Sequence, residues 1–309
     1  MLEASIPFAI TVLIILCGYL IKRIGLVKDA DGKVLSRIVI NFTLPCLILS
    51  KVETIKVSGE TFLLIGLGLL SGVCLQIISA FVTKGKPTEF RGAYSLCLSG
   101  YNIGLLAYPI AEMLWGDTGL SYLIMFDLGN GIVLFGLNYV MASRYATSKI
   151  PSFKEIVKTL FCSVPFITYI LVIILASFKV RYPQFISELL GTIASGNTVM
   201  SLLLLGITLT FAFSKKEMKV MLQILGVRYG FGLLAACAIM LLAPFPMVEK
   251  MALVMAVLLP ISVSAVSYTI EYNFDVKLVS AVNNLSTLIS LSVIWILIGI
   301  VFPLIGVTV

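Results

Sequence analysis

Long apolar runs recur along the whole chain, and they constrain its fold more than any other feature. Each run holds about 20 residues, the length that a helix needs to cross roughly 30 Å of hydrocarbon. Of the 309 residues, 60% are hydrophobic and only 12% are charged. A soluble domain has too little polar surface to cover so much apolar material. The sequence therefore predicts an all-α polytopic membrane protein.

The apolar runs predict ten membrane-spanning helices, at approximately residues 6–24, 33–50, 61–83, 88–114, 118–142, 157–178, 185–212, 218–242, 249–271 and 277–303. The first run has no basic segment before it and no small-residue cleavage site after it, which predicts a retained span. Ten spans divide into five and five. An odd number per half forces opposite insertion, so residues 1–145 and 146–309 are predicted to form two inverted repeats.

The distribution of Lys and Arg predicts the orientation. Seventeen of the 22 basic residues lie on the side of the connection between the first two spans. Because cytoplasmic loops carry the excess of Lys and Arg, this side is predicted to be cytoplasmic, with both termini outside. Because the basic residues are spread through short loops, we interpret them as topology signals and not as a binding patch, and we expect no nucleic-acid partner.

Two predicted spans contain helix breakers at matched positions of the two halves. The stretch SGYNIGLLAYPIAEMLWG (99–116) contains Pro109, and LLPISVSAVSY (258–268) contains Pro260. Proline removes a backbone donor, and unpaired backbone survives in a membrane only inside protein or beside a cavity. Either proline alone could merely kink a packed helix. The matched pair favours a transporter site near the bilayer midplane, where spans 4 and 9 are broken.

Candidate substrate-binding residues lie in these two stretches or in the amide-bearing span that follows the second: Asn102, Gly104, Tyr108, Pro109, Pro260, Ser262, Ser264, Asn283 and Asn284. Asn102 ranks first, because an amide at a break can donate and accept hydrogen bonds. It could also cap a half-helix, and the two roles can coexist. Arg228 could attract an anion, although we expect its charged end to reach the cytoplasmic interface.

Two further residues are candidates for a coupling ion. Asp127 lies near the middle of span 5, where a carboxylate is costly unless it is paired or protonated. It could carry a proton, or it could hold span 5 against the broken helices, and the sequence does not separate these roles. Asn130 is one turn further on and shares the same helix face. Sodium coupling would instead need several oxygen ligands from Asn, Ser and free carbonyls.

Three segments carry a family resemblance. NIGLLAYP (102–109) with the following Gly116-Asp117 turn resembles the fourth-span signature of the auxin efflux carrier family. This family includes plant auxin exporters and bacterial malate and malonate permeases. LLPISVSAVSYTIEYNFD (258–275) is similar to the ninth span of that family, and INFTLPCLILSKVE (40–53) is similar to its second span. The resemblance covers essentially the whole chain.

The resemblance implies a scaffold of spans 1, 2, 6 and 7 that forms a homodimer. It also implies a transport core of spans 3–5 and 8–10, in which spans 4 and 9 cross as broken helices and the core moves like an elevator. Two features depart from the plant exporters. A second proline at the crossover is replaced here at about Ala265, and the long central loop is short. Both departures point to a compact prokaryotic-type carrier and weaken auxin as the substrate.

The predicted function is secondary active transport of small organic anions across the plasma membrane, with H⁺ or Na⁺ as possible coupling ions. The alternatives are a cation or proton antiporter with the same crossed helices, and a membrane ligand sensor. The chain has no His, and it has no Walker A, GxGxxG, HExxH or GxSxG motif. We therefore predict neither an enzyme nor a cofactor or metal site. Surrounding lipid is the only other partner that we expect.

Overall fold

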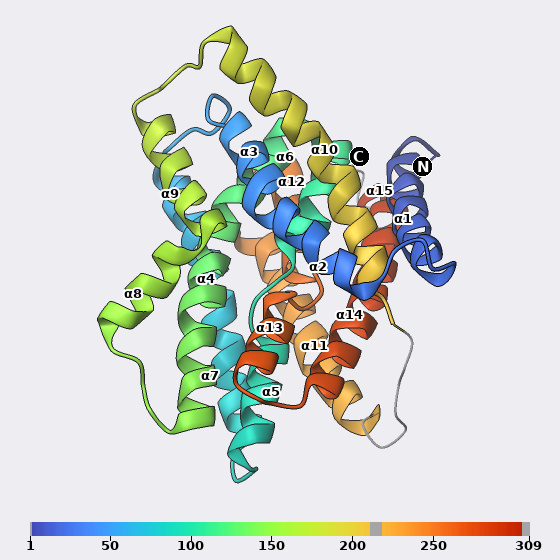
Figure 1. Ribbon diagram of the computed structural model, residues 1–309. Helices are drawn as coiled ribbons and strands as arrows, with labels where there is room; N and C mark the ends of the chain where they lie inside the picture. The colour runs from blue at the N-terminus through green and yellow to red at the C-terminus, as the bar shows by residue number, and fades with distance from the viewer. Residues whose placement is uncertain (1, 211–217, 305–309) are drawn as a thin grey trace.

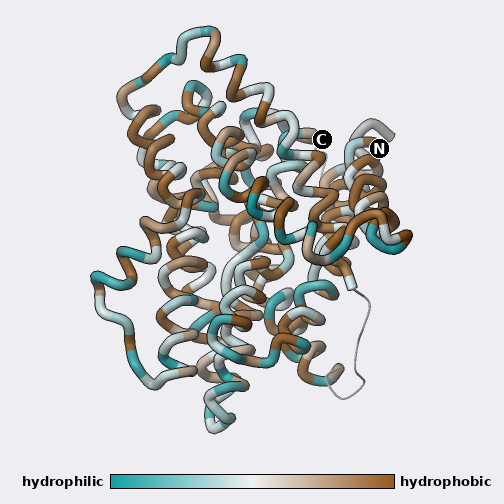
Figure 2. The backbone as a smooth tube through the Cα atoms, in the orientation of Figure 1, coloured by the Kyte–Doolittle hydropathy of each residue, from teal (hydrophilic) through white to brown (hydrophobic). Residues whose placement is uncertain are grey.

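The computed structural model describes residues 2–210 and 218–304. Every regular element in those two segments is helical, and neither contains a strand. The all-α class is thus confirmed. The hydrophobic residues run along the lengths of the helices, whereas hydrophilic residues gather mainly at the connections (Figure 2). Many outward-facing side chains are large and apolar, among them Leu13, Phe62, Leu70 and Leu234, as expected for helices that contact lipid.

Five helices are long: α1 (Leu2–Arg23), α4 (Gly59–Val82), α10 (Gln184–Thr208), α11 (Met218–Leu242) and α14 (Val276–Ile296). The helix α6 (Tyr108–Gly131) is equally long but bends at Gly116, which has φ 57° and ψ −146°. Shorter helices complete the described chain: α2 (Asp29–Ile38), α3 (Leu44–Ser50), α5 (Thr88–Leu98), α7 (Asn138–Thr147), α8 (Phe153–Cys162), α9 (Val164–Ser177), α12 (Met247–Val257), α13 (Ser264–Glu271) and α15 (Phe302–Leu304).

Four π-helical segments join consecutive helices: η1 (Val39–Thr43), η2 (Ile103–Ala107), η3 (Ile132–Leu137) and η4 (Leu297–Val301). Three of them are followed by a helix whose second residue is a proline, namely Pro45, Pro109 and Pro303. Proline cannot donate to the carbonyl four residues earlier, and its ring crowds that carbonyl. The wider π turn accommodates this defect without ending the helix.

Seven helical stretches among the described residues are long and apolar enough to cross a membrane. The number rises to eight if α8 and α9, which meet at 82°, form one bent span. The residues from Thr88 to Thr147, for which the sequence predicted two spans, form a single run of 60 residues. Where the sequence predicted one span at 249–271, the structure has two short helices, α12 and α13, of 11 and 8 residues. The structure therefore supports a multi-span membrane protein, and the count of ten stays a prediction.

Close glycine contacts bring pairs of helices together. A Cβ placed on Gly129 of α6 would lie 2.0 Å from the carbonyl oxygen of Ile65 in α4, and one on Gly68 would lie 2.1 Å from that of Phe126. The pair α1 and α10 approaches in the same way through Gly206. Small residues allow such close backbone contact between membrane helices.

The broken segments lie inside the bundle. In Figure 1, α9 and α10 are joined at the top of the molecule, whereas α5 begins near the bottom. In that view α12 lies in the upper half and α5 and α13 lie in the lower half, all between α4 on the left and α14 on the right. All residues of α12 after Lys250 are buried, which places a short, broken apolar helix in the interior. This arrangement positions the candidate site.

Candidate functional site at two contacting backbone breaks

The first break covers residues 99–102, between α5 and η2. Gly100 has φ +84°, and a Cβ there would lie 2.2 Å from the Leu134 side chain. A residue with a side chain would therefore meet both an unfavourable conformation and a clash. The sequence analysis had assigned this discontinuity to Pro109. That placement was wrong, because the π turn η2 accommodates the proline and the helix breaks before Ile103.

The second break covers residues 258–263, between α12 and α13. It contains Pro260, as the sequence predicted. The backbone N–H of Asn102 donates to the carbonyl of Pro260 over 3.1 Å. The two breaks, which lie more than 150 residues apart in sequence, are thus in direct contact. Such pairing satisfies backbone groups that lipid could not.

Asparagine side chains hold the first break from the second half of α6 and from α7. The Asn130 amide pairs with both backbone groups of Tyr101: its Oδ1 accepts from the N–H over 2.9 Å and its Nδ2 donates to the carbonyl over 3.0 Å. Asn138 donates to the carbonyl of Ser99 over 3.4 Å. Asn130, predicted as a coupling-ion ligand, therefore acts here as a backbone partner.

Serine side chains hold the second break from α14. The N–H of Ile261 donates to Ser286 over 3.2 Å, and Ser290 donates to the carbonyl of Leu258 over 2.8 Å. The sequence analysis named Asn283 and Asn284 of the same helix and missed these serines. Their spacing of four residues, which places them on one helix face, was the signal that could have found them.

Arg228 of α11 joins the two breaks. Its side chain is 2% exposed. Its Nη1 donates to the Leu98 carbonyl, and its Nη2 lies 2.8–3.0 Å from three more carbonyl oxygens, those of Gly100, Leu259 and Pro260. The guanidinium carbon also lies 4.8 Å from the centre of the Tyr101 ring. The expectation that this charge reaches the membrane interface was wrong.

The position of Arg228 has a clear electrostatic basis. The helices α5 and α12 both end at the breaks, and helix C-termini carry partial negative charge. A guanidinium provides several donors in a fixed plane and compensates both ends at once. None of the ion pairs found among the described residues involves Arg228. Backbone carbonyl dipoles and the Tyr101 ring therefore balance its charge.

A cavity of about 390 Å³ lies beside the breaks. We call it the crossover cavity. Four of the predicted substrate-binding residues line it: Asn102, Gly104, Ser262 and Ser264. The other five do not, namely Tyr108, Pro109, Pro260, Asn283 and Asn284. The wall opposite the breaks comes from the segment α2–η1–α3, through Ser36, Ile40 and Leu44, and from α9.

Two of the predicted residues outside the cavity have other partners. Asn284 donates to the carbonyl and to the hydroxyl of Thr210 over 3.1 and 2.7 Å. The hydroxyl of Tyr108 donates to Asp127 over 2.9 Å. Asn283 has a buried side-chain oxygen without a hydrogen-bond partner, but this oxygen is not part of the cavity wall.

Among the residues of the cavity wall, Asn102 gives the strongest indication of a bound ligand. The residue is 5% exposed, and its side-chain Nδ2 has no hydrogen-bond partner. A buried amide donor without a partner costs free energy. A ligand with an acceptor oxygen in the crossover cavity would remove that cost. The ranking of Asn102 as the first candidate agrees with this geometry.

Asp127 lines the cavity and accepts three hydrogen bonds. The donors are Asn130 over 2.8 Å, Tyr108 over 2.9 Å and the hydroxyl of Tyr169 over 2.5 Å. Tyr169 belongs to α9, and sequence reasoning missed it. The carboxyl group therefore links α6 to α9, which favours the holding role that the sequence left open. The only other carboxylate in the described wall is Glu271, and no Lys or Arg lines it.

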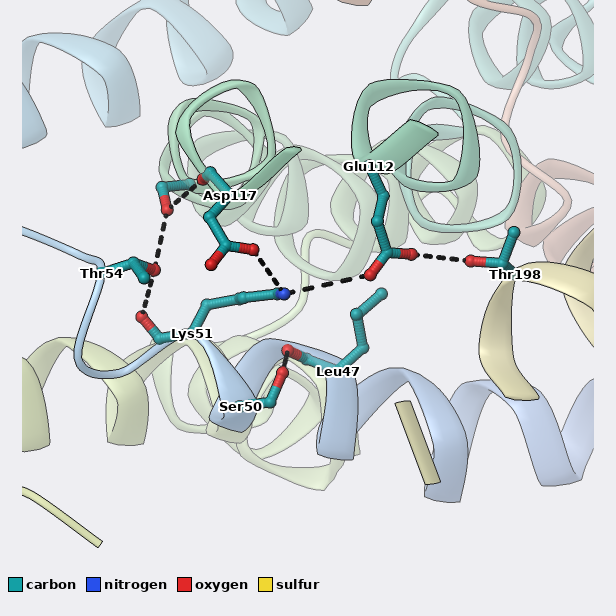
Figure 3. Close-up of polar contacts among 8 residues, drawn as sticks. Leu47, Ser50, Lys51, Thr54, Glu112, Asp117 and Thr198 are labelled. Atoms are coloured by element: carbon teal, nitrogen blue, oxygen red, sulfur yellow. Dashed lines mark hydrogen bonds and ion pairs between the residues drawn. The ribbon is translucent and has the colours of Figure 1, made fainter. Parts of the chain in front are cut away.

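A second polar cluster lies at the end of the bundle where α6 bends, and we call it the Lys51 network (Figure 3). The Lys51 ammonium lies 2.7 Å from Asp117 and 3.9 Å from Glu112. Thr198 of α10 donates to Glu112 over 2.8 Å. These contacts connect α3 and α10 to both sides of the bend at Gly116.

Together, several membrane-crossing helices and a polar cavity beside two contacting backbone breaks define a polytopic transport protein. The chain belongs to the membrane transport protein family, the auxin efflux carrier family, which it matches over residues 4–298. The family resemblance read from the three sequence segments is thereby confirmed.

Two relatives extend this result to archaeal proteins. The chain is 29% identical to an uncharacterized transporter of Methanocaldococcus jannaschii, over 94% of this chain and 97% of the relative. It is 24% identical to an uncharacterized transporter of Methanothermobacter thermautotrophicus, over 90% and 92% of the two chains. Both relatives are named as transporters, which is consistent with the prediction that the chain is not an enzyme.

Proposed function

We propose that the protein is a secondary active transporter of small organic anions, such as malate, malonate or an auxin-like weak acid, in the plasma membrane. The substrate binds in the crossover cavity. The observation that carries this proposal is the buried Asn102 Nδ2 without a partner in the cavity wall. The buried guanidinium of Arg228, 4.8 Å from the centre of the cavity-lining Tyr101 ring, adds a positive potential that favours an anion.

The proposal includes ten spans in two inverted repeats, residues 1–145 and 146–309. The bend at Gly116 divides the 60-residue helical run into two spans. The helices α12 and α13 then form one broken span. In each half, the break is held by the span that follows it, through Asn130 in one and Ser286 in the other. This repeated relation supports matched positions in the two halves.

We further propose that the core moves against the scaffold. The crossover cavity lies between predicted core residues at the breaks and scaffold residues on α2 and α9. Elevator-like movement would carry the substrate past these scaffold helices. The scaffold would form the homodimer, and both termini would be extracytoplasmic. Asp127 is the candidate for a coupling proton, with Asn130 as its neighbour.

The test is transport into proteoliposomes that contain the full chain. Charge movement and uptake are measured on adding malate, malonate, succinate or indole-3-acetate. Wild type is compared with Asn102→Ala and with Asn41→Ala, whose exposed amide donates to the Arg37 carbonyl and does not line the described cavity wall. We expect flux for at least one anion, lost in Asn102→Ala and kept in Asn41→Ala. Absence of flux for all four anions, or equal flux in both variants, would contradict the proposal.

A cation carrier is the second candidate function, and one observation favours it. The described wall of the crossover cavity contains the carboxylates of Asp127 and Glu271 and no basic residue. Tetramethylammonium and Na⁺ are therefore tested in the same proteoliposomes. Flux of a cation without flux of any anion would replace the anion proposal.

A further inference from the structure

A second, larger cavity lies away from the crossover, at the end of the bundle that carries the Lys51 network. Its volume is about 790 Å³. The segment between α3 and α4, the beginning of α4, the part of α6 after the bend, and the first turn of α12 form its wall. None of the residues around the two backbone breaks lines it. It is therefore a separate site, and we call it the acidic cavity.

Negative charge dominates the acidic cavity. Its described wall contains four carboxylates, Glu53, Glu60, Asp117 and Glu249, against the single basic residue Lys56. Three of the four carboxylates already have a partner. Glu53 accepts from the N–H of Tyr182, Glu60 accepts from the hydroxyl of Tyr122, and Asp117 pairs with Lys51.

Glu249 differs from the other three. It is only 7% exposed, and its Oε2 has no hydrogen-bond partner. The adjacent Lys250 does not neutralise it, because its ammonium donates to the Met240 carbonyl over 3.0 Å. The first turn of α12 offers only partial positive charge, which is less than the full charge of a carboxylate. A buried carboxylate without a cation or donor is costly, so this oxygen indicates a missing ligand.

The arrangement of the carboxylates limits the ligand. No three acidic groups in the described chain are close enough to surround one metal ion. The charges are instead spread along a wall that also presents Ile55, Leu64 and Met125. A flexible aliphatic chain with several ammonium groups fits both features. Each ammonium can meet a separate carboxylate, and the methylene segments can lie on the apolar side chains.

We propose that the acidic cavity binds a linear aliphatic polyamine cation, with Glu249 as its buried anchor and Glu60 as a second contact. The site is independent of the transported substrate. Binding there would neutralise charge between α4, α6 and α12, which are the elements that form the wall.

The test is isothermal titration of spermidine into the purified full-length chain at physiological salt. We expect saturable binding, weakened about tenfold or more in Glu249→Gln, which corresponds to about 1.4 kcal/mol. Glu60→Gln should weaken binding as well. Because Glu60 is exposed, we expect this substitution to leave the fold intact. The control Glu188→Gln removes an exposed carboxylate of α10 outside the cavity and should bind like wild type.

Three results would overturn the proposal. The first is no saturable binding, or equal affinity in all three glutamine variants. The second is Mg²⁺ binding that displaces spermidine at equal concentration, which would assign the site to a metal ion. The third is loss of spermidine binding in Asn102→Ala, which would place the polyamine in the crossover cavity. Transport activity of wild type is not required for any of these results.

Discussion

Removal of the Arg228 guanidinium should destabilise the fold more than removal of any exposed basic side chain. This group is the one that connects the end of α5 to the end of α12. In Arg228→Met, the Pro260 carbonyl keeps the N–H of Asn102 as a donor. The carbonyls of Leu98, Gly100 and Leu259 lose the guanidinium, and the side chain that remains is apolar.

The structure sets the size of the effect. Each buried carbonyl left without a donor costs about 1–3 kcal/mol. Methionine also removes the cost of burying a charge, and the breaks can relax. Three such carbonyls amount to about 3–9 kcal/mol, and with these two offsets we expect Arg228→Met to cost about 3–5 kcal/mol, the lower part of that range. Arg228→Lys should recover part of the loss, because an ammonium reaches fewer of the carbonyls.

The free energy of unfolding in detergent measures this prediction. Arg144→Met is the matched control, since Arg144 is exposed at the end of α7 and should change stability by less than about 0.5 kcal/mol. If Arg228→Met unfolds within about 1 kcal/mol of the control, the carbonyl contacts do not hold the breaks together. If Arg228→Met cannot be purified, the free energy of unfolding of Arg228→Lys is compared with that of Arg144→Met instead.

Three more predictions concern helix contacts and charges. Gly68→Ala should cost about 1–3 kcal/mol of unfolding free energy, since its Cβ would meet the Phe126 carbonyl at 2.1 Å. Gly66→Ala on the same helix meets nothing within 4 Å, and a similar cost there would refute the packing argument. Lys51→Met should cost less than about 1 kcal/mol, because Asp117 is 54% exposed and water screens the pair; a larger cost that survives high salt would show this to be wrong. Asp127→Asn should remove the response of transport to a pH gradient while substrate exchange continues, if Asp127 carries the coupled proton. A pH response equal to that of wild type would assign Asp127 to the holding role alone.

The sequence predicted the fold class, the family and the two broken regions, because these depend on composition and short-range chemistry. The thickness of the hydrocarbon layer sets the length of an apolar run that crosses it, so such runs can be recognised without knowledge of the tertiary structure. A proline indicates a missing backbone N–H donor, but the surrounding structure determines where the helix breaks. At Pro109 a π turn absorbs it, and the break moves to residues 99–102. Rules that use only the neighbouring residues do not predict that the break lies at residues 99–102 and not at Pro109.

The partners of the breaks were harder to predict, because they come from distant segments. Arg228 lies about 130 residues after α5 and fits the breaks only through a tertiary arrangement. The sequence named Asn283 and Asn284 by analogy with the first half, but serines perform that role in α14. Asn102 was ranked first from the sequence, and it lines the crossover cavity.

Labelling of a cysteine in the wall of the crossover cavity tests whether this cavity is the substrate site of a carrier. Ser264→Cys is introduced after all six native cysteines, which are free, have been replaced. A membrane-impermeant thiol reagent should label this position from the side of the Lys- and Arg-rich loops, and a transported anion should protect it. Labelling that the transported anion leaves unchanged would contradict the claim.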